Sequence, residues 1–392
     1  MSEGETKNGY VVFGGRAYPR EAVVFVGLVI LLLIFLGLTA FVARSYHKKV
    51  HVLADSWFAQ GEAESQDGRS ANALTDYRNA LAFTPGNPKF QFHLAQALAA
   101  TGREEEARSY LTNLLSESPG SGEVNLELAR VAASQKHTLE AVRFYQSAIY
   151  GEWTKNPINT RWNVRRELCE FLLDHNAATQ AEPEVIALAD NTPSDNVPQL
   201  KAAAALLLRA QLWTRALDEF HTVLESSRHD ADALAGAGAA AFNLAQYPRA
   251  LGYFNRLPRD RREDPNVSAM ADTARRILAS DPFLTGISLK EKALRTSRAL
   301  TEAQSRVTQC SQEKGQAVTA VPASTGLQQL FATSRQMEPD WTVRNLERHP
   351  ELVVSAMDLA FQMENAAAQS CGQPQGQDRA LWLLGRNRGG AQ

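Results

Sequence analysis

Residues 57–85 read WFAQGEAESQDGRSANALTDYRNALAFTP, and residues 91–119 read QFHLAQALAATGREEEARSYLTNLLSESP. The two stretches carry the same small, aromatic and proline positions 34 residues apart, and part of the pattern returns a third time. The shared positions are Gly68 and Gly102, Pro85 and Pro119, Ala73, Ala107 and Ala141, Tyr77, Leu111 and Tyr145, and Ala80, Leu114 and Ala148. A fixed period of about 20–50 residues is the signature of stacked supersecondary elements, so residues 54–150 are predicted to be a repeat array.

Each repeat has the sequence pattern of two helices joined by a tight turn. Trp57, Gln60, Gly61 and Glu64 lie at helical spacing within 57–66. A second helix is predicted over 71–83, where Ala73, Leu74, Tyr77, Ala80 and Leu81 fall on one side. Asp67 and Gly68 between them are a turn signal, and Pro85 ends the second helix because proline cannot continue the hydrogen-bond ladder. One such pair cannot bury its apolar face alone, but a stack of pairs can.

This pattern resembles the tetratricopeptide repeat (TPR) family. The matching residues are Trp57, Gly61, Gly68, Ala73, Tyr77, Ala80 and Pro85 in the first repeat, Leu94, Ala95, Gly102, Ala107, Leu111 and Pro119 in the second, and Leu128, Ala129, Ala141, Tyr145 and Ala148 in the third. The third repeat departs from the family because it lacks the closing proline, and Gly151 ends its helix instead. The resemblance implies an α-solenoid of antiparallel helix pairs, and a helical hairpin array of another family is the alternative.

Residues 151–258 are predicted to hold three further, degenerate repeats. The step from Ala141 to Ala181 is 40 residues, so about six residues are inserted after the third repeat, whereas Ala216 and Ala250 are again 34 apart. The alanine-rich composition and the scarcity of alternating strand patterns indicate an all-α protein. The predicted architecture is an N-terminal transmembrane helix, a TPR-like α-solenoid and a C-terminal helical cap region.

The amino-terminal part of the chain predicts a membrane anchor. Residues 1–20 are polar and glycine-bearing and are expected to be a disordered tail, and residues 21–44 are the predicted transmembrane helix. Its core, residues 22–43, carries no charge and would span about 33 Å as a helix, against a hydrocarbon core of about 30 Å. A buried helix of a soluble domain and a cleaved signal peptide are the alternatives, but the apolar run is long for a signal peptide. Residues 45–53 are expected to continue the helix toward the first repeat.

The basic residues that flank this span do not decide its orientation. Three precede it and three follow it, namely Lys7, Arg16 and Arg20, and Arg44, Lys48 and Lys49. A short tail before the span and a large domain after it resemble a bacterial signal anchor. The predicted location is therefore the inner membrane with a periplasmic domain, and a cytoplasmic domain is the alternative.

From residue 259 the repeat pattern changes. Residues 259–314 are predicted to be capping helices, among them one long helix over 288–314 whose apolar seam is short for a coiled coil. Residues 315–392 are predicted to be a further helical region. The apolar run 380–384 is expected to dock on that region, and contact with a partner is the alternative.

Three cysteines exclude a dense disulfide framework. Cys169 occupies a small packing position and is expected to be a buried apolar residue. Cys310 and Cys371 both lie near predicted helix ends. A disulfide between them is a hypothesis that requires an oxidising compartment, and two free thiols are the alternative.

The motifs of common enzymes are not found in the sequence. It carries no phosphate-binding glycine loop, no zinc-protease histidine pair and no nucleophile-elbow serine, so we expect no enzymatic activity, no cofactor and no small-molecule substrate. The net charge of -2 gives no general affinity for nucleic acid. His47 and His51 lie one helical turn apart, but without a third ligand nearby a solvated helix face is the preferred interpretation over a metal site.

The resemblance implies that the first helix of each repeat lines a concave groove that binds a protein or peptide. The residues expected there are Phe58, Glu62, Phe92, Gln96, Leu126, Arg130, Arg166 and Glu170. The basic clamp with which some TPR proteins hold a terminal carboxylate is not encoded, because Glu123 and Glu127 occupy places that would have to be basic. Phe58 and Phe92 favour an amphipathic helix or an extended peptide as the ligand. The alternative is that the two phenylalanines pack against each other between repeats.

These observations favour a membrane-anchored TPR scaffold that recruits or assembles envelope proteins through protein–protein contacts. Tethering would raise the local concentration of whatever it binds. An ancillary periplasmic chaperone for exported clients and a regulatory subunit of an exopolysaccharide or secretion complex are the alternatives.

Overall fold

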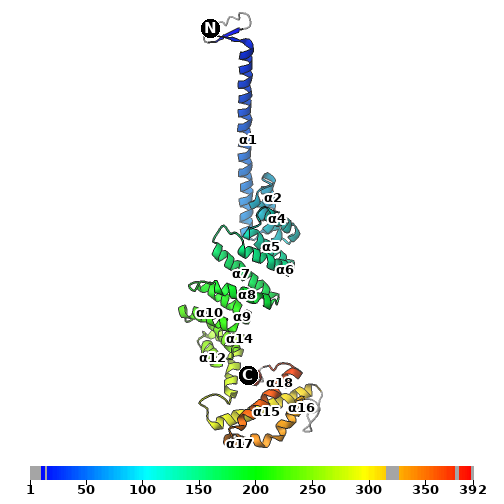
Figure 1. The fold of residues 1–392 in the computed structure, drawn as a ribbon, viewed down its shortest axis with the longest axis vertical. Helices are drawn as coiled ribbons and strands as arrows, with labels where there is room; N and C mark the ends of the chain where they lie inside the picture. The colour runs from blue at the N-terminus through cyan, green and yellow to red at the C-terminus, as the bar shows by residue number, and fades with distance from the viewer. Residues whose placement is uncertain (1–9, 14–15, 315–325, 376–378, 390–392) are drawn as a thin grey trace. The chain divides into compact units, whose positions relative to one another are not determined.

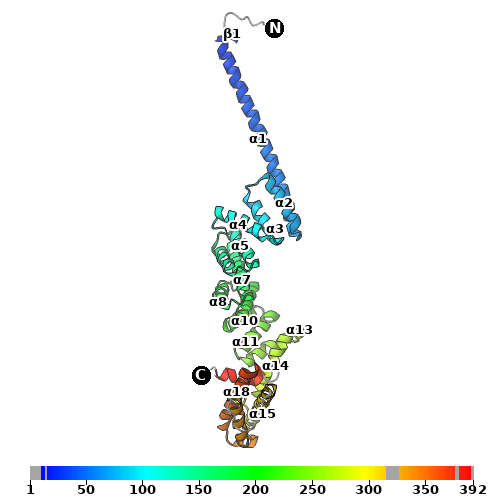
Figure 2. The same cartoon turned by 90° about the vertical axis from the view of Figure 1, so that its right-hand side faces the viewer.

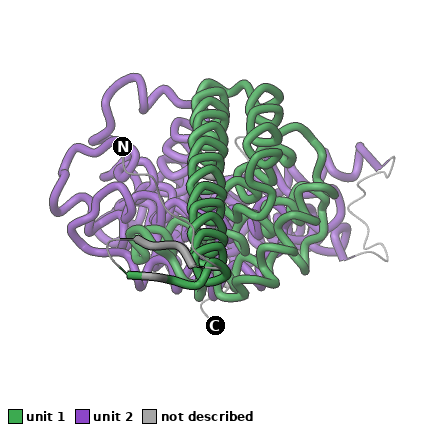
Figure 3. The backbone as a smooth tube through the Cα atoms, turned by 90° about the horizontal axis from the view of Figure 1, so that it is seen from above, with its two compact units in different colours: residues 1–165 green, residues 166–392 purple. Residues whose placement is uncertain are grey.

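The computed structural model of the chain describes residues 10–13, 16–314, 326–375 and 379–389. They divide into two compact units, residues 1–165 (unit 1) and residues 166–392 (unit 2), which Figure 3 distinguishes by colour. Nearly all described elements are helices, which confirms the predicted all-α class. Each unit is described by itself below.

Unit 1 consists of a short hairpin followed by a run of antiparallel helices (Figure 1). Its elements are β1 (Tyr10–Phe13), β2 (Arg16–Pro19), α1 (Arg20–Gln66), α2 (Ser70–Phe83), α3 (Pro88–Ala100), α4 (Glu104–Glu117), α5 (Gly122–Ser134), α6 (Thr138–Tyr150) and the first part of α7 (Pro157–Asp174). The end of α1 packs with α2, α3 packs with α4 and α5 packs with α6. The pairs stack on one another through α2 against α3 and α4 against α5, which is the helix-pair order that the repeat period predicts.

The amino-terminal hairpin corrects one expectation. β1 and β2 pair in antiparallel register, with Tyr10 opposite Pro19. The prediction of a disordered tail over residues 1–20 is therefore wrong for these two strands, and the rest of that tail lies outside the described residues. The cause is local sequence, since β1 carries Val11 and Val12 and β2 carries Tyr18, and β-branched and aromatic residues favour strands.

Helix α1 runs without a break from Arg20 to Gln66, as Figures 1 and 2 both show. Among the described helices it is the one long and apolar enough to cross a membrane, and its most apolar window has a mean hydropathy of 3.0 with no residue buried. Its apolar side chains are exposed on all sides; the exposed fractions of Phe25, Leu31 and Phe41 are 68%, 67% and 70%. A helix that is apolar all round belongs in a protein core or in a bilayer, and nothing within unit 1 covers this one in the described residues.

One residue with positive φ closes the turn inside each helix pair. These residues are Gly68, Gly102 and Lys136 in unit 1, and Asn176, Gln211 and Ala245 in unit 2, with φ values from 55° to 77°. Glycine adopts this left-handed conformation at no steric cost, whereas a residue with a Cβ pays about 1–2 kcal/mol. The turn therefore persists in the later repeats although its glycine has been lost, which is why their sequences look degenerate.

Unit 2 continues the helix pairs and ends in a helical bundle (Figure 1). Its elements are the second part of α7, α8 (Ala178–Asp190), α9 (Val197–Arg209), α10 (Trp213–Ser226), α11 (Ala231–Asn243), α12 (Tyr247–Asn255), α13 (Arg259–Arg262), α14 (Pro265–Ser280), α15 (Leu289–Glu313), α16 (Gly326–Gln336), the 3-10 turn η1 (Glu338–Trp341), α17 (Val343–Arg348), α18 (Leu352–Cys371) and α19 (Arg379–Gly389). Helices α9 and α10 form one pair, α11 and α12 form the next, and α14 packs on both members of the latter. The long helix α15 packs against α16, α17 and α18, so its apolar seam is the core of a bundle.

The last helix folds back onto unit 2. Leu381 and Leu384 of α19 are 1% and 5% exposed, and α19 packs against α14 and α18. The Asn387 side chain hydrogen-bonds to the hydroxyl of Tyr247 in α12, and the Arg388 guanidinium lies 3.5 Å from the centroid of the Phe283 ring. The apolar run 380–384 therefore docks within unit 2, as expected.

Candidate functional site

A cavity of about 780 Å³ opens on unit 1 along the first helices of its three repeats. It lies between α1, α3 and α5, with the end of α4 and residues 151–156 beside them. We call it the unit 1 groove. Its lining residues are Glu62, Pro88, Lys89, Phe92, His93, Gln96, Leu114, Glu117, Ser118, Ser121, Glu123, Val124, Leu126, Glu127, Trp153, Thr154 and Lys155.

Four of the predicted groove residues line this cavity. Glu62 comes from α1, Phe92 and Gln96 come from α3, and Leu126 comes from α5. Phe92 and Gln96 share one face because they lie one helical turn apart, and Asn87 fixes the start of α3 by accepting two backbone N–H hydrogen bonds. The structure thus brings side chains of three repeats to one surface, and their role in binding remains a prediction.

Phe58 does not lie in the groove. Its exposed fraction is 4%, and its ring stacks on that of Phe90 with 4.7 Å between the centroids. Tyr77 meets it at 5.5 Å, and the Nζ atom of Lys89 lies 4.1 Å from the ring centroid. The groove assignment of Phe58 is therefore wrong, because α3 turns Phe90 toward α1 and covers the ring. The packing alternative names Phe92 as the partner of Phe58, whereas the ring that stacks on Phe58 belongs to Phe90.

Arg130 is held by a polar contact between the second and third repeats. The Gln96 amide donates to Glu127 Oε1 at 3.0 Å, and Arg130 Nη1 donates to the same oxygen at 2.8 Å. Glu127 is 9% exposed, so this carboxylate has exchanged water for two protein donors. Arg130 is not among the lining residues and acts on the groove by neutralising Glu127.

The two remaining predicted groove residues pair with each other. Arg166 Nη1 lies 2.6 Å from Glu170 Oε1, one helical turn further along α7. Both side chains are half-buried. They belong to unit 2, and their predicted role in binding remains a prediction.

The groove surroundings alter the pKa of His93. Its ring makes edge contacts with Phe58 and Phe92, with centroids 5.1 Å and 5.7 Å away. Burial lowers the pKa of His93 from its ordinary value of 6.5, and the attraction of Glu62 offsets only part of that effect. The imidazole is therefore neutral at pH 7 and contributes an aromatic, uncharged surface to the groove.

Residues 151–156, here called the insert, form one wall of the groove that the sequence analysis missed. Trp153, Thr154 and Lys155 all line the cavity. The one available signal was the break in the repeat period after the third repeat, but a loop without periodicity gives no direction for its side chains. The structure shows that residues 153–155 of this loop supply groove surface, whereas most of the extra length of the fourth repeat lies in α7, which has 18 residues.

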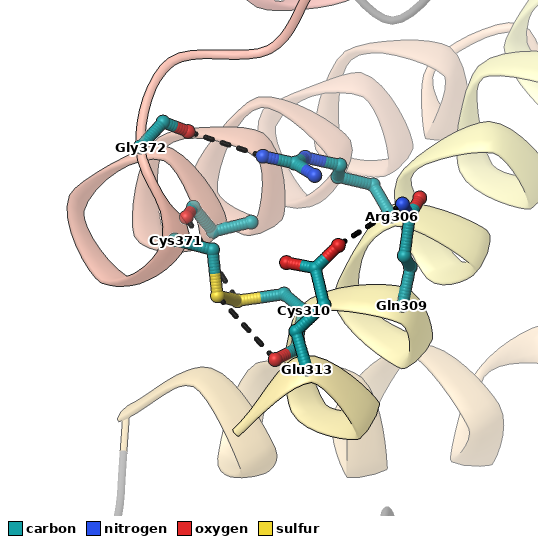
Figure 4. The surroundings of a disulfide bond; sticks show 7 residues. Arg306, Gln309, Cys310, Glu313, Cys371 and Gly372 are labelled. Carbon is teal, nitrogen blue, oxygen red and sulfur yellow. Dashed lines mark hydrogen bonds between the residues drawn. A yellow bond between two sulfur atoms is a disulfide. The ribbon is translucent and has the colours of Figure 1, made fainter. Parts of the chain in front are cut away.

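A disulfide ties the bundle of unit 2 together (Figure 4). It joins Cys310 near the end of α15 to Cys371 at the end of α18, across 61 residues of sequence and with 5.8 Å between the Cα atoms. Arg306 donates a hydrogen bond to the carbonyl oxygen of Gly372 at 3.1 Å beside it. Cys169 is buried and takes no part in this disulfide. The pair is the one hypothesised from the sequence.

These features define an α-solenoid protein, built from stacked helix pairs, with a groove along the first helices of successive pairs. A family model for the tetratricopeptide repeat matches residues 58–121 and 94–157. Residues 58–157 therefore carry tetratricopeptide repeats, as the sequence pattern indicated. Among the described residues no group of three or more potential metal ligands occurs.

Comparison with solved structures finds the following proteins among its matches. YrrB, described as a TPR protein with an unusual peptide-binding site, is 16% identical with a TM-score of 0.39, over 50% of this chain and 97% of its own. PilF of Pseudomonas aeruginosa is 16% identical with a TM-score of 0.41, over 57% of this chain and 96% of its own. PilW, described as a type IV pilus biogenesis factor, is 15% identical with a TM-score of 0.41, over 55% and 96%. No curated protein sequence matches the chain.

Proposed function

We propose that this chain is a membrane-anchored TPR scaffold that binds a protein segment in the unit 1 groove and has no chemistry of its own. The observation that carries the proposal is that the groove draws its lining from three successive repeats while its first helix, α1, also contains the exposed apolar span. Glu62 and the apolar residues 22–43 belong to the same helix. A partner bound in the groove would therefore be held at the membrane at a raised local concentration.

We propose further that unit 2 lies in an oxidising compartment, with the span in the inner membrane and the repeats in the periplasm. The Cys310–Cys371 disulfide supports this location, because cytosolic reductants keep most thiols reduced. The alternative orientation, with a cytoplasmic domain, would leave both thiols reduced.

Photo-crosslinking from the groove tests the scaffold. A photoreactive amino acid replaces Phe92 in the full chain in its native membranes, and a second variant carries it at Tyr150, which is 79% exposed on α6 and is not a lining residue. We expect discrete protein adducts from position 92 and not from position 150. Equal adducts from both positions, or none from a correctly folded position-92 variant, would contradict the proposal.

Thiol counting tests the location. Protein denatured without reductant should take up one alkylating group, at Cys169, and three after reduction. Protease added to spheroplasts should digest the region after α1. Three reactive thiols without reductant, together with protection from protease, would place the domain in the cytoplasm instead.

A further inference from the structure

The insert is an addition to the regular repeat that contributes directly to the groove. Six residues, 151–156, separate α6 from α7, whereas four residues separate α2 from α3 and four separate α4 from α5. Three of the six side chains, Trp153, Thr154 and Lys155, line the cavity. Of the four residues 84–87 that join α2 to α3, none lines the cavity.

The insert is fixed in place by its backbone as well as by its side chains. The backbone N–H of Gly122 donates to the Glu152 carbonyl at 3.0 Å, and the N–H of Glu152 donates to the Gly120 carbonyl at 2.7 Å. The indole N–H of Trp153 donates to the Ala148 carbonyl at 2.9 Å. These bonds attach the insert to the start of α5 and the end of α6. The insert is therefore a wall of the groove that hydrogen bonds hold in position.

Space at Gly122 is needed for this attachment. A Cβ atom at that position would lie 2.4 Å from the Trp153 ring, and one at Gly151 would lie 2.7 Å from the Gly122 Cα. The two glycines let the insert approach α5 closely enough for both backbone hydrogen bonds. The space at the two glycines and the hydrogen bond to Ala148 therefore fix the position of the Trp153 ring.

The chemistry of the groove is apolar with an excess of carboxylates. Phe92, Val124 and Leu126 supply apolar surface. Three glutamates of the lining, Glu62, Glu117 and Glu123, form no ion pair within the described part of the chain.

The lining also contains two positively charged side chains, those of Lys89 and Lys155. The ammonium of Lys89 lies over the Phe58 ring, and Lys155 stands on the insert. Arg130 neutralises the fourth lining carboxylate, Glu127, at 2.8 Å. With His93 neutral, the balance of the lining is negative, so a ligand with positive charge is electrostatically favoured.

We infer that the insert determines what the unit 1 groove binds: an extended peptide segment that carries a basic side chain beside a large apolar one. The apolar side chain lies against Phe92 and the Trp153 wall, and the basic side chain meets Glu123 at the start of α5. Lys155 on the same wall repels segments with more positive charge than the carboxylates can match. This inference rests on the proposed function and specifies the partner of the same site.

Two fluorescein-labelled peptides of eight residues test the charge preference against the purified full chain in detergent. Both carry the same phenylalanine and leucine; one has two arginines and the other has two glutamates at the same places. We expect the arginine peptide to bind about tenfold more tightly at low salt, with the difference shrinking as salt is added. Equal binding, or tighter binding of the glutamate peptide, would overturn the inference.

Charge variants locate the effect. Glu123→Gln should weaken binding of the arginine peptide by about two- to fivefold. Glu104→Gln is the matched control, because Glu104 also lies in the first turn of a helix but does not line the groove, and it should leave binding unchanged. Lys155→Glu should tighten binding of the same peptide by a similar factor, and weaker binding by that variant would count against the assignment.

The wall itself is tested by Trp153→Ala, which should reduce the affinity for the arginine peptide and the discrimination between the two probes together. Circular dichroism shows whether this variant folds, and Lys155→Glu remains decisive if it does not, since Lys155 is exposed. Failure of the inference is distinguishable from failure of the proposed function. Adducts from position 92 with no charge preference would keep the scaffold and remove the inference, whereas a groove that yields no adduct and binds neither probe would remove both.

Discussion

At the scale of single residues, the left-handed turn inside each helix pair shows how the fold tolerates sequence change. Gly68 and Gly102 adopt positive φ without strain, while Lys136, Gln211 and Ala245 adopt the same conformation with a Cβ present. The cost at the latter positions is outweighed by the packing of the helices on either side. The packing of the flanking helices therefore imposes the left-handed turn conformation even where the turn residue is not glycine.

Ala245→Gly should stabilise the protein by about 1 kcal/mol, because it relieves the Cβ clash at φ 58° at the smaller cost of extra backbone freedom in the unfolded chain. Gly102→Ala, at φ 77°, should lose a similar amount. Thermal unfolding followed by circular dichroism measures both. If the two substitutions moved the midpoint in the same direction, the strain argument would be wrong.

His93 makes the stability of unit 1 depend on pH. The pKa of His93 in the folded state lies below 6.5. At pH values between this pKa and 6.5, the unfolded chain therefore binds more protons than the folded chain. Stability should therefore be constant above about pH 7.5 and fall as the pH decreases through 6.5. His93→Gln should flatten this part of the stability profile, measured as urea midpoints between pH 5 and 8; an unchanged slope in the variant would exclude His93 as the cause.

At the scale of elements, the insert and the disulfide are features that a plain stack of helix pairs does not need. The insert depends on close approach of backbone to backbone at Gly122 and Gly151. The disulfide joins the carboxyl ends of α15 and α18, which frame the bundle of unit 2. Each is a local device that holds an irregular part of the chain in one place.

Gly122→Ala should displace the Trp153 ring and break its hydrogen bond to Ala148, at a cost of about 1–3 kcal/mol for overpacking. Gly120→Ala is the control, because its nearest neighbour would be at an ordinary 3.5 Å. Thermal unfolding distinguishes the two. Equal midpoints for both variants would mean that the insert is not anchored at Gly122.

Cys371→Ser should destabilise unit 2 by about 4 kcal/mol, the chain-entropy value for a loop of 61 residues. The measurement is the unfolding midpoint of the wild-type and variant proteins with and without reductant. Reductant should lower the midpoint of the wild-type protein and leave that of the variant in place. A wild-type midpoint insensitive to reductant would show that the bond contributes nothing to stability.

The sequence predicted regular parts of these elements well and irregular parts poorly. Periodicity identified the helix pairs because buried tyrosines, Tyr77 and Tyr145, recur at the same position of the repeat. It could not say that Phe90 would cover Phe58, since periodicity gives the face of a helix but not what the next repeat places on it. It also could not orient Trp153, because a loop has no period, and the polar appearance of residues 1–20 concealed the valines that pair in β1.

At the scale of the whole molecule, the apolar span of α1 is the feature that the proposed location depends on. Two arginines, Leu31→Arg with Phe35→Arg, should offset most of the insertion free energy, at about 3 kcal/mol each near the bilayer centre. Detergent partitioning and alkaline extraction of membranes should then release the variant. Val52→Arg, outside residues 22–43 on the same helix and exposed, should leave the protein in the membrane fraction.

The unbroken course of α1 has a mechanical consequence. Glu62 lies 19 residues beyond residue 43, or about 28 Å along the helix axis, with no hinge between them. If the span crosses a bilayer as proposed, an inclination of about 20° would carry Glu62, which lines the groove, about 10 Å sideways over the lipid surface. Bilayer thickness, which sets that inclination, would thereby set where a captured segment is presented.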